Sequence, residues 1–337
     1  MSGPEAKLIR NGRDLAALEP EWWELWRRAR TSTPFQSPAW LIPWWRHFHP
    51  GKLTTAAAWR GERLIGLAPF YREDGSNRRR LLPIGISISD HHDVLLDQEL
   101  EQEAARRLVE AFEQEPSWDS LELEELTPGA AALSLPRPAG CEELLVDHSA
   151  CPVLALSGAE LARFVPKAKR ANLNTARNRS ARRGPVTIAR AEGAAIPHAL
   201  DHLIRLHSLR WDGRGEQGVL SDPRVVAFHR DAAPRLDTAG LLRLYTLALD
   251  GEVIAALYGL HQGGRSYSYL TGFDPAYGFE SPGLILLAHV IEEALAEGAS
   301  EFHFLRGRET YKYEWGAVDR MNRRRSFRRI AAERSVA

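Results

Sequence analysis

One order of predicted elements occurs twice in this sequence, and that repeat limits the folds open to the chain. In each half, a hairpin with a glycine turn precedes an amphipathic helix and then a short apolar strand. The matched residues are Gly61 with Gly251, Ala105 with Ala288, and Leu121 with Phe302. The separation between matched residues changes only slowly along the chain, which indicates a duplication.

The repeated elements predict an α/β protein with mixed sheets. The chain has 337 residues, which is long for one domain and comfortable for two. We expect an N-terminal domain over residues 1–150 and a C-terminal domain over residues 151–337. Each is expected to be a mostly antiparallel twisted sheet flanked by helices. Residues 127–152, rich in Pro, Gly and Ala, are expected to form the crossing segment between the halves.

The composition excludes several classes of protein. Lys and Arg number 44 and Asp and Glu number 44, so the formal net charge is zero and no global attraction to nucleic acid follows. The 2 cysteines are too few for a disulfide scaffold, which favours a reducing compartment. The N-terminus has no apolar signal core and no run is long enough to span a membrane. We expect a cytoplasmic protein without a bound metal; its oligomeric state is left open.

The stretch 301–316 is the strongest candidate for a functional site. Phe302 and Phe304 alternate with their neighbours as in a strand, and the chain then breaks at Gly307 into a dense run of charged and phenolic side chains. Ligands of α/β proteins collect at the carboxyl ends of strands, so this run is where chemistry is expected. The alternative is a solvated loop with a surface ion pair.

This stretch also carries a family resemblance. Residues 304–316 read Phe-Leu-Arg-Gly-x-Glu-x-Tyr-Lys-x-x-Trp-Gly, which resembles the C-terminal signature of the cellulose-biosynthesis (CelD/BcsL-like) acetyltransferases. That family belongs to the GNAT superfamily of acyl-CoA-dependent N-acyltransferases, and it is distantly similar to the Fem-type aminoacyl transferases. The resemblance implies two tandem GNAT-like domains, acyl-CoA as co-substrate, and a small-molecule, sugar or envelope-precursor amine as acceptor.

The chemistry of amine attack on a thioester suggests roles for three residues of the signature. The ammonium must lose a proton, the oxyanion needs hydrogen-bond donors, and the thiolate leaves more easily with a proton. We expect Glu309 to orient or deprotonate the amine and Tyr311 to serve the leaving thiolate. Lys312 is expected to neutralise phosphate or oxyanion charge.

The donor site is expected at the strand that ends near Gly272 and at the helix that follows it. Ser281 reads as an N-cap and Pro282 as a first helical residue, and free backbone N–H groups at a helix N-terminus bind anions. The expected donor-binding residues are Gly272, Phe273, Ser281, Gly283 and Leu284. The usual Gly-rich GNAT motif is reduced here to Ser-Pro-Gly, and Glu280 opposes phosphate, so another activated acyl group is an alternative donor.

Several polar residues are candidates for binding the acceptor. Asp90, His91, His92 and Asp93 stand between two apolar strands, and alternate residues point to opposite faces, which argues against convergence on one metal ion. The alternative is a structural turn capped by Asp90. In the helix over 203–211, His207 either faces the substrate or is a core histidine. The expected acceptor-binding residues are Asp90, His91, Asp93, His207, Trp211, Asp274 and Arg306.

A basic helix is predicted over residues 167–183. Its Lys and Arg side chains are suited to the phosphates of CoA, a nucleotide-sugar or RNA, or they pair with acidic neighbours on a solvated helix. Two other functions remain open. One is a Fem-type aminoacyl-tRNA-dependent transferase, for which tRNA is a partner; the other is a non-catalytic binding module with a GNAT-like fold.

Overall fold

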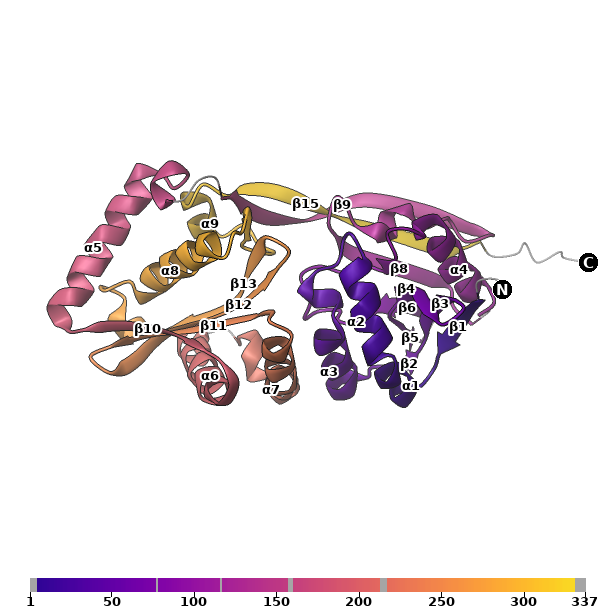
Figure 1. The fold of residues 1–337 in the computed structure, drawn as a ribbon, viewed down its shortest axis with the longest axis horizontal. Helices are drawn as coiled ribbons and strands as arrows, with labels where there is room; N and C mark the ends of the chain where they lie inside the picture. The colour runs from indigo at the N-terminus through magenta and orange to yellow at the C-terminus, as the bar shows by residue number, and fades with distance from the viewer. Residues whose placement is uncertain (1–4, 77, 116, 157–159, 213–216, 331–337) are drawn as a thin grey trace, which may run out of the picture. The chain divides into compact units, whose positions relative to one another are not determined.

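The computed structural model describes residues 5–330, except 77, 116, 157–159 and 213–216 (Figure 1). The chain divides into two compact units, Met1–Ser149 with Met321–Ala337 and Ala150–Arg320. The expected boundary at residue 150 lies beside this division. The expected extent of the second domain differs, because residues 321–330 are part of the N-terminal unit.

The N-terminal unit contains two sheets. Its strands are β1 (Glu5–Ile9), β2 (Lys52–Leu53), β3 (Thr55–Arg60), β4 (Arg63–Ala68), β5 (Phe70–Asp74), β6 (Arg79–Pro83), β7 (Leu95–Leu96) and β8 (Ser120–Leu126). Its helices are α1 (Gly12–Ala17), α2 (Glu19–Arg28), α3 (Pro38–Phe48) and α4 (Glu101–Glu113). One sheet has the order β1-β3-β4-β7, and the other includes β8-β6-β5-β2. Two further strands, β9 (Cys141–Ala155) and β15 (Val318–Arg329), begin in one unit and end in the other.

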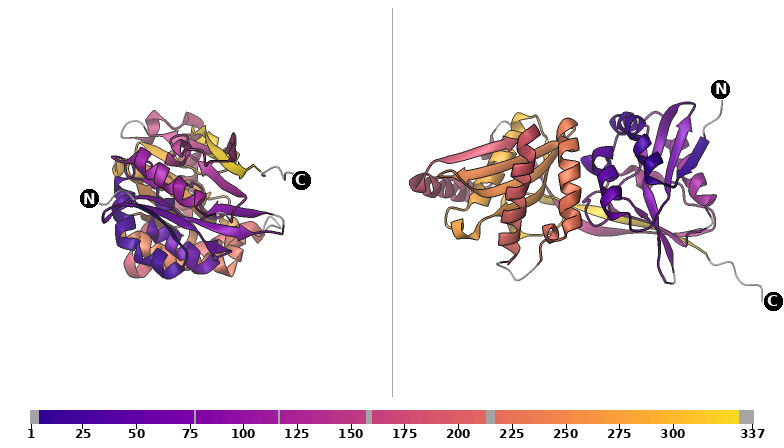
Figure 2. Two further views of the ribbon diagram at one scale, coloured as in Figure 1. Left: turned by 90° about the vertical axis from the view of Figure 1, so that its right-hand side faces the viewer. Right: turned by 90° about the horizontal axis from the view of Figure 1, so that it is seen from below.

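The C-terminal unit is built on one sheet with helices on both faces (Figure 1). Its other strands are β10 (Val186–Ala191), β11 (Leu242–Leu249), β12 (Glu252–Gln262), β13 (Arg265–Phe273) and β14 (Glu301–His303). Its helices are α5 (Lys167–Arg183), α6 (Ile196–Asp212), α7 (Pro223–Thr238), α8 (Pro282–Ala296) and α9 (Thr310–Glu314). The strand order is β10-β11-β12-β13-β14-β9. Helices α6 and α7 lie side by side on one face (Figure 2) and α8 lies on the other.

The sequence repeat corresponds to a structural repeat. Both expected hairpins form: β3 and β4 turn at Gly61, and β11 and β12 turn at Gly251, where positive φ values of 61° and 83° suit glycine. In each unit a helix then connects two parallel strands, α4 between β6 and β8, and α8 between β13 and β14. The other strand pairs with a known register are antiparallel, so the expected α/β class with mostly antiparallel sheets is confirmed.

Each unit has its own hydrophobic core around that helix. In the N-terminal unit, Leu108 and Phe112 of α4 pack with Ile65 and Leu121, all less than 3% exposed. In the C-terminal unit, the α8 residues Ala288 and Ile291 are fully buried against the β12 and β14 side chains. Residues 141–152, expected to belong to the crossing segment, instead form most of the long strand β9. Its C-terminal end pairs with β14, from Val153 opposite His303 to Ala155 opposite Glu301.

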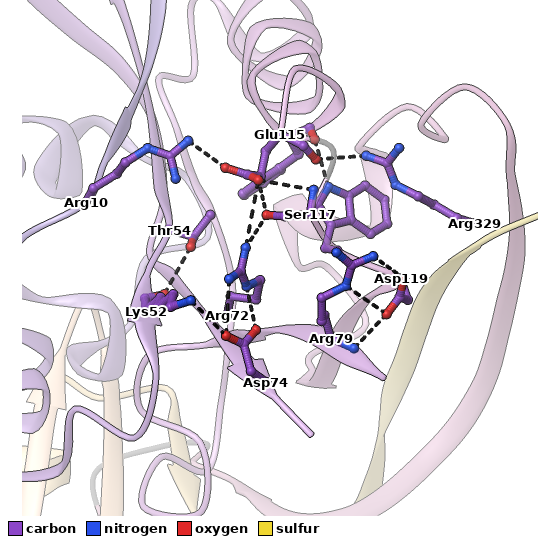
Figure 3. Close-up of polar contacts among 12 residues, drawn as sticks. Arg10, Lys52, Thr54, Arg72, Asp74, Arg79, Glu115, Ser117, Asp119 and Arg329 are labelled. Carbon is purple, nitrogen blue, oxygen red and sulfur yellow. Dashed lines mark hydrogen bonds and ion pairs between the residues drawn. The ribbon is translucent and has the colours of Figure 1, made fainter. Parts of the chain in front are cut away.

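Polar contacts tie the last described strand to the N-terminal unit (Figure 3). The Arg329 guanidinium donates to the Glu115 carbonyl at 2.9 Å and lies 4.3 Å from the centre of the Trp118 ring. The carboxylate of Glu115 pairs with Arg10, which follows β1, at 2.5 Å. Nearby, Asp119, which precedes β8, pairs with Arg79 at 2.8 Å. These contacts join residues from both ends of the chain and explain why β15 completes this unit.

A buried carboxylate in the same unit gives a test of this architecture. The Asp97 side chain is fully buried and accepts from Arg28 Nε at 2.8 Å and from Arg63 Nη2 at 2.6 Å. Burial alone would raise the pKa of Asp97, but the two guanidinium groups outweigh it and hold the pKa below its usual value. We predict that Asp97→Asn lowers the free energy of unfolding by about 2–3 kcal/mol, measured by urea denaturation at pH 7.

The matched control is Glu99→Gln. Glu99 also pairs with Arg63, at 3.0 Å, but its side chain is 67% exposed, so its loss should cost less than about 1 kcal/mol. Because the pKa of Asp97 is depressed in the folded state, its contribution is present above pH 4 and lost as the pH falls further. Equal destabilisation by the two substitutions would contradict this assignment.

Candidate active site

Two parallel strands of the C-terminal unit separate after a short paired region, which opens a space at their carboxyl ends. Residues 265–267 of β13 pair with residues 301–303 of β14, but β13 continues to Phe273 while β14 ends at His303. Leu305 and Gly307 then adopt positive φ values of 58° and 104°, which turn the chain away from β13. A leucine rarely adopts this conformation, so neighbouring contacts must hold the turn.

The turn is held by the side chain of Lys312. Its ammonium donates to the carbonyl oxygens of Leu305, Arg306 and Gly307 at 3.3, 2.6 and 3.2 Å. It also pairs with Glu309 Oε2 at 2.8 Å. The side chain is only 3% exposed and does not line the donor pocket described below. Because protein groups surround the ammonium, Lys312 holds this turn in place of the expected role in neutralising phosphate.

A pocket of about 330 Å³ is lined by residues of β12, β13, α8 and α9. We call it the donor pocket. Most of its wall is apolar, and its polar side chains include Arg210, Ser268, Thr271 and Tyr311. All five expected donor-binding residues line this pocket: Gly272, Phe273, Ser281, Gly283 and Leu284. Such a size and lining are typical of a site for a small organic group.

Tyr311 is the expected catalytic residue that lines the donor pocket. Burial, then the charge of Glu309, raise the pKa of its phenol to about 12, although Arg210 opposes the shift. The phenol is therefore neutral and able to donate a hydrogen bond at physiological pH. Within the described part of the chain, its hydroxyl has no hydrogen-bond partner. Glu309 is 57% exposed and lies outside the pocket wall.

The backbone of β13 also presents donors to this space. The N–H of Asp274 bonds to the Ile254 carbonyl on β12 at 2.9 Å. Because successive backbone groups of a strand alternate between its two neighbours, the N–H groups of Thr271 and Phe273 are directed away from β12. They therefore point to the side from which β14 has departed. The N–H of Gly272 points toward β12 and is therefore not directed into this space.

Gly272 has a packing reason to be glycine. A Cβ at this position would lie 2.6 Å from the backbone nitrogen of His207 and 2.8 Å from the carbonyl carbon of Leu206. Helix α6 therefore approaches β13 closely at this point. The strand is held between α6 and the donor pocket.

The start of α8 differs from the expected cap. Ser281 has a left-handed φ of 53°, and its hydroxyl donates to the Gly278 carbonyl at 3.3 Å instead of capping the helix. Pro282 lacks an N–H, and the Leu284 N–H bonds to the Ser281 carbonyl at 3.0 Å. Few backbone donors are thus left for an anion. Glu280, expected to oppose phosphate, is paired with Arg183 at 2.9 Å, which compensates its charge.

The basic helix forms as α5, and part of its charge is paired. Lys169 pairs with Glu314 at 2.7 Å, and Arg177 with Glu292 at 3.0 Å. With the Arg183 pair, these contacts bear out the expectation of acidic neighbours for three of its basic residues. Arg182 has no hydrogen bond or ion pair within the described residues.

His207 and Trp211, expected to bind the acceptor, contact each other. Trp211 Nε1 donates to His207 Nε2 at 3.0 Å, and His207 is only 3% exposed. Gly218 packs directly on the His207 ring, where a Cβ would lie 2.2 Å from Cε1. The arrangement is that of a core histidine. Nearby, the buried His229 ring packs on Phe228 and Tyr258.

The remaining expected acceptor residues are spread over both units. Asp93 accepts from Thr31 Oγ1 and from the N–H groups of Val94, Ala131 and Ala132 at 2.7 to 2.9 Å, so its carboxylate organises a loop. Burial raises its pKa to about 6 despite these bonds.

Asp90 and His91 are buried in the N-terminal unit beside the Asn322 side chain, at 3.5 Å from it. In the C-terminal unit, Asp274 accepts from the Ala276 N–H at 2.9 Å, and Arg306 offers its carbonyl to Lys312. Neither of these two side chains is part of the donor pocket wall.

The structure reveals polar residues that the sequence analysis did not single out. Arg210 lines the donor pocket and donates to Thr271 Oγ1 at 3.0 Å. The only sequence signal for it is its place in the Leu-His-x-x-Arg-Trp run. In the N-terminal unit, buried Glu125 has a φ of 54° and accepts from Asn322 Nδ2 at 2.9 Å. Nothing in the sequence connects two residues so far apart.

Two searches of the described residues gave negative results. Within residues 5–330, leaving out the gaps named above, no three or more His, Cys, Asp and Glu side chains are grouped so that they would hold a metal ion. Over the same part of the chain, no helix combines the length and the apolar character needed to cross a membrane.

Comparison with known proteins agrees with the geometry of the C-terminal unit. Residues 167–313 match the family model described as an acetyltransferase (GNAT) domain. This range contains α5, all the lining residues of the donor pocket except Trp315, and most of the signature stretch. The match supports an acyltransferase enzyme, as the sequence predicts. No curated protein matches the chain in sequence.

Solved structures with a similar fold extend over both units. FemX is 11% identical with a TM-score of 0.67, and the match covers 95% of this chain and 96% of that one. The C-terminal domain of an Agrobacterium fabrum protein assigned as a lysylphosphatidylglycerol synthetase is 13% identical with a TM-score of 0.58, covering 93% and 91%. A Bacteroides thetaiotaomicron protein of unknown function is 12% identical with a TM-score of 0.61, covering 92% and 97%. At these identities the comparison concerns the fold alone.

The buried histidines give a prediction for stability. Burial lowers the pKa of His229 to about 3 and, with Arg210 as a second cause, that of His207 to about 4. Unfolded histidine has a pKa near 6.5, so unfolding takes up protons and becomes easier as the pH falls from about 6.5 toward 4. We predict that wild-type protein loses about 2 kcal/mol more of its free energy of unfolding between pH 7 and pH 4.5 than His229→Phe does, measured by urea denaturation.

The control is His198→Gln. His198 is exposed, and its substitution should leave the pH dependence unchanged. A wild-type pH dependence in His229→Phe would refute the assignment.

Proposed function

We propose that this protein is an N-acyltransferase that moves an acyl group from acyl-CoA to a primary amine. The observation that carries the proposal is the donor pocket beside β13 and α8, with a neutral tyrosine in its wall. The match of residues 167–313 to an acetyltransferase domain supports the same class of reaction. The signature over 304–316 further supports a place among the cellulose-biosynthesis type of GNAT proteins.

The donor fits this pocket by its chemistry. A short acyl group is apolar, as most of the wall is, and the two amides of a pantetheine arm would find partners among the polar groups of the same wall. The thioester carbonyl would accept from the N–H of Thr271 or Phe273, which are not used by β12. These donors would strengthen their bonds as negative charge develops on that oxygen.

The reaction forms an amide and releases the thiol of CoA. The amine nitrogen attacks the thioester carbon, the carbon–sulfur bond breaks, and the proton lost by nitrogen balances the departing thiolate. We assign Glu309 to orient the amine or accept its proton, directly or through water. A phenol with a pKa of about 12 is a weaker acid than a thiol, so Tyr311 would stabilise the thiolate by donating a hydrogen bond without full proton transfer.

The acceptor is proposed only as a class. A primary amine on a sugar, an amino acid or an envelope precursor suits the family resemblance, and a cytoplasmic location suits acyl-CoA. Asp90 and His91 stay predictions as acceptor-binding residues.

An aminoacyl-tRNA-dependent reaction of the Fem type is the second candidate. It is favoured by the fold shared with FemX and by the exposed basic residues of α5. It would use the same carbonyl chemistry with an ester donor. Titration with acetyl-CoA separates the two: a ligand with a Kd of about 10 μM should stabilise the protein by about 2.7 kcal/mol at 1 mM. No stabilisation by acetyl-CoA or free CoA would overturn the acyl-CoA proposal.

We predict that Tyr311→Phe slows acyl transfer by about 10²-fold with little change in acetyl-CoA binding. The reason is that the hydroxyl would act mainly as the thiolate leaves. The assay follows thiol release from acetyl-CoA with hydroxylamine as a surrogate amine. The matched control is Tyr313→Phe, because Tyr313 bonds to Asp319 at 2.6 Å outside the pocket and should leave the rate unchanged. An active Tyr311→Phe enzyme would remove this role.

We predict that Glu309→Gln lowers the rate by about 10- to 100-fold, since an amide cannot accept the amine proton. The substitution also weakens the pair with Lys312, so the urea midpoint is measured alongside the rate. A rate loss with an unchanged midpoint supports the catalytic role. If stability falls in step with the rate, Glu309 acts only by holding the Lys312 turn.

A further inference from the structure

A second hollow lies beside the donor pocket, on the side of α5. It has a volume of about 690 Å³, and we call it the outer hollow. Its wall is formed by one face of α5 and by two residues before α8. The lining residues that matter here are Arg179, Arg182, Arg183, Phe279 and Glu280. The hollow is strongly cationic, because three guanidinium groups face a single carboxylate.

Some charged side chains of the outer hollow have ion-pair partners within the protein, and others do not. Glu280 is 6% exposed and is compensated by Arg183, whose guanidinium also lies 4.3 Å from the centre of the Tyr277 ring. Arg179 donates to the Phe279 carbonyl at 3.3 Å and has no ion-pair partner in the described structure. Arg182 is exposed and makes no polar contact within the described residues. Two cationic groups are therefore left for an external anion.

An exposed aromatic ring stands next to these cations. Phe279 is 66% exposed, which is unusual for so large an apolar side chain. The Arg179 guanidinium lies 4.1 Å from the ring centre and steadies it. An exposed ring that a cation holds in place is suited to stack a flat heterocycle, and a purine base is such a group.

The two hollows adjoin along one loop. Gly278, Ser281, Pro282 and Gly283 line the donor pocket, whereas Phe279 and Glu280 line the outer hollow. A ligand too long for the donor pocket would therefore cross this loop and reach α5. The loop itself offers few backbone N–H donors, so an anionic ligand must find its countercharges on side chains.

We propose that the outer hollow binds the 3′-phosphoadenosine part of CoA, with Arg182 and Arg179 on the phosphates and Phe279 stacked on adenine. This inference rests on the proposed acyl-CoA donor and names the residues that hold its nucleotide end. Helix α5 thereby supplies the cationic contacts that the reduced Ser-Pro-Gly motif at the start of α8 does not.

The distribution of charge along α5 favours a nucleotide over an RNA chain. Lys169 and Arg177, which would extend a basic track along the helix, are paired with carboxylates. Arg179 and Arg182, which have no carboxylate partner among the described residues, share one hollow of the size of a mononucleotide, whereas the exposed Lys167 lies at the other end of the helix. A long polyanion would instead need phosphate contacts along its length.

The test compares three thioesters by calorimetric titration of the whole protein: acetyl-CoA, acetyl-dephospho-CoA and S-acetylpantetheine. We expect loss of the 3′-phosphate to weaken binding to the wild type about tenfold. In Arg182→Gln this difference should shrink to about twofold or less. In Phe279→Leu both nucleotide thioesters should weaken by about fivefold or more, while S-acetylpantetheine is unaffected. The control is Lys167→Gln, an equally exposed cation at the other end of α5, which should change none of these ratios.

The outcomes separate this inference from the proposed function. If acetyl-CoA binds but Arg182→Gln keeps the full preference for the 3′-phosphate, the outer hollow is not the nucleotide site and the acyl-CoA donor stands. Equal binding of acetyl-CoA and acetyl-dephospho-CoA by the wild type would likewise show that the outer hollow is not the nucleotide site, while the acyl-CoA donor stands. If none of the three thioesters binds, the donor is wrong and the inference fails with it. Binding of tRNA that weakens in Arg182→Gln would then identify the hollow as part of an RNA surface.

Discussion

The contact on which the site depends is one buried ammonium on three carbonyl oxygens. Lys312 satisfies the carbonyls of Leu305, Arg306 and Gly307 just where β14 ends. Without such a partner, these oxygens would be left unpaired in a turn that already contains a left-handed leucine. The turn leads the chain away from β13 and into α9, which carries Tyr311 in the donor pocket wall. Lys312, which the sequence suggested for a chemical role, therefore positions the chain. The adjacent Tyr311 lines the pocket because Lys312 is directed into the turn.

The same logic explains the other unusual features around the pocket. Gly272 is small because α6 passes behind β13, and Ser281 is left-handed because the chain must enter α8 close to the pocket wall. Each departure from local preference lies on an edge of one cavity. Natural chains accept such local conflicts mainly where function requires a particular shape.

The fold could be predicted from the sequence because the repeat, the hairpins and the amphipathic helices are local patterns. The donor pocket wall could also be predicted, since it follows from the strand and helix that carry Gly272 and Gly283. What could not be predicted is how side chains share partners. Lys312, His207 and Asp93 look reactive in the sequence, yet each is used by contacts that only the folded chain brings together. Strand β9 was missed because its Pro- and Gly-rich approach resembles a linker. The partners of Glu125 and Arg329 lie too far along the chain to be paired from a pattern.

The place of β15 has a consequence for how the protein is made. This strand pairs with β8, from Phe327 opposite Leu121 to Arg323 opposite Leu126, yet almost the whole C-terminal unit is translated between the two. During synthesis, the first unit to leave the ribosome is the last to be completed. Until residues 321–329 emerge, the edge of β8 that they cover has unpaired backbone groups. The C-terminal unit is the continuous segment 150–320, so it does not wait for a later part of the chain. Nascent chains should therefore finish the unit with the donor pocket first, and the edge of β8 stays uncovered in the interval.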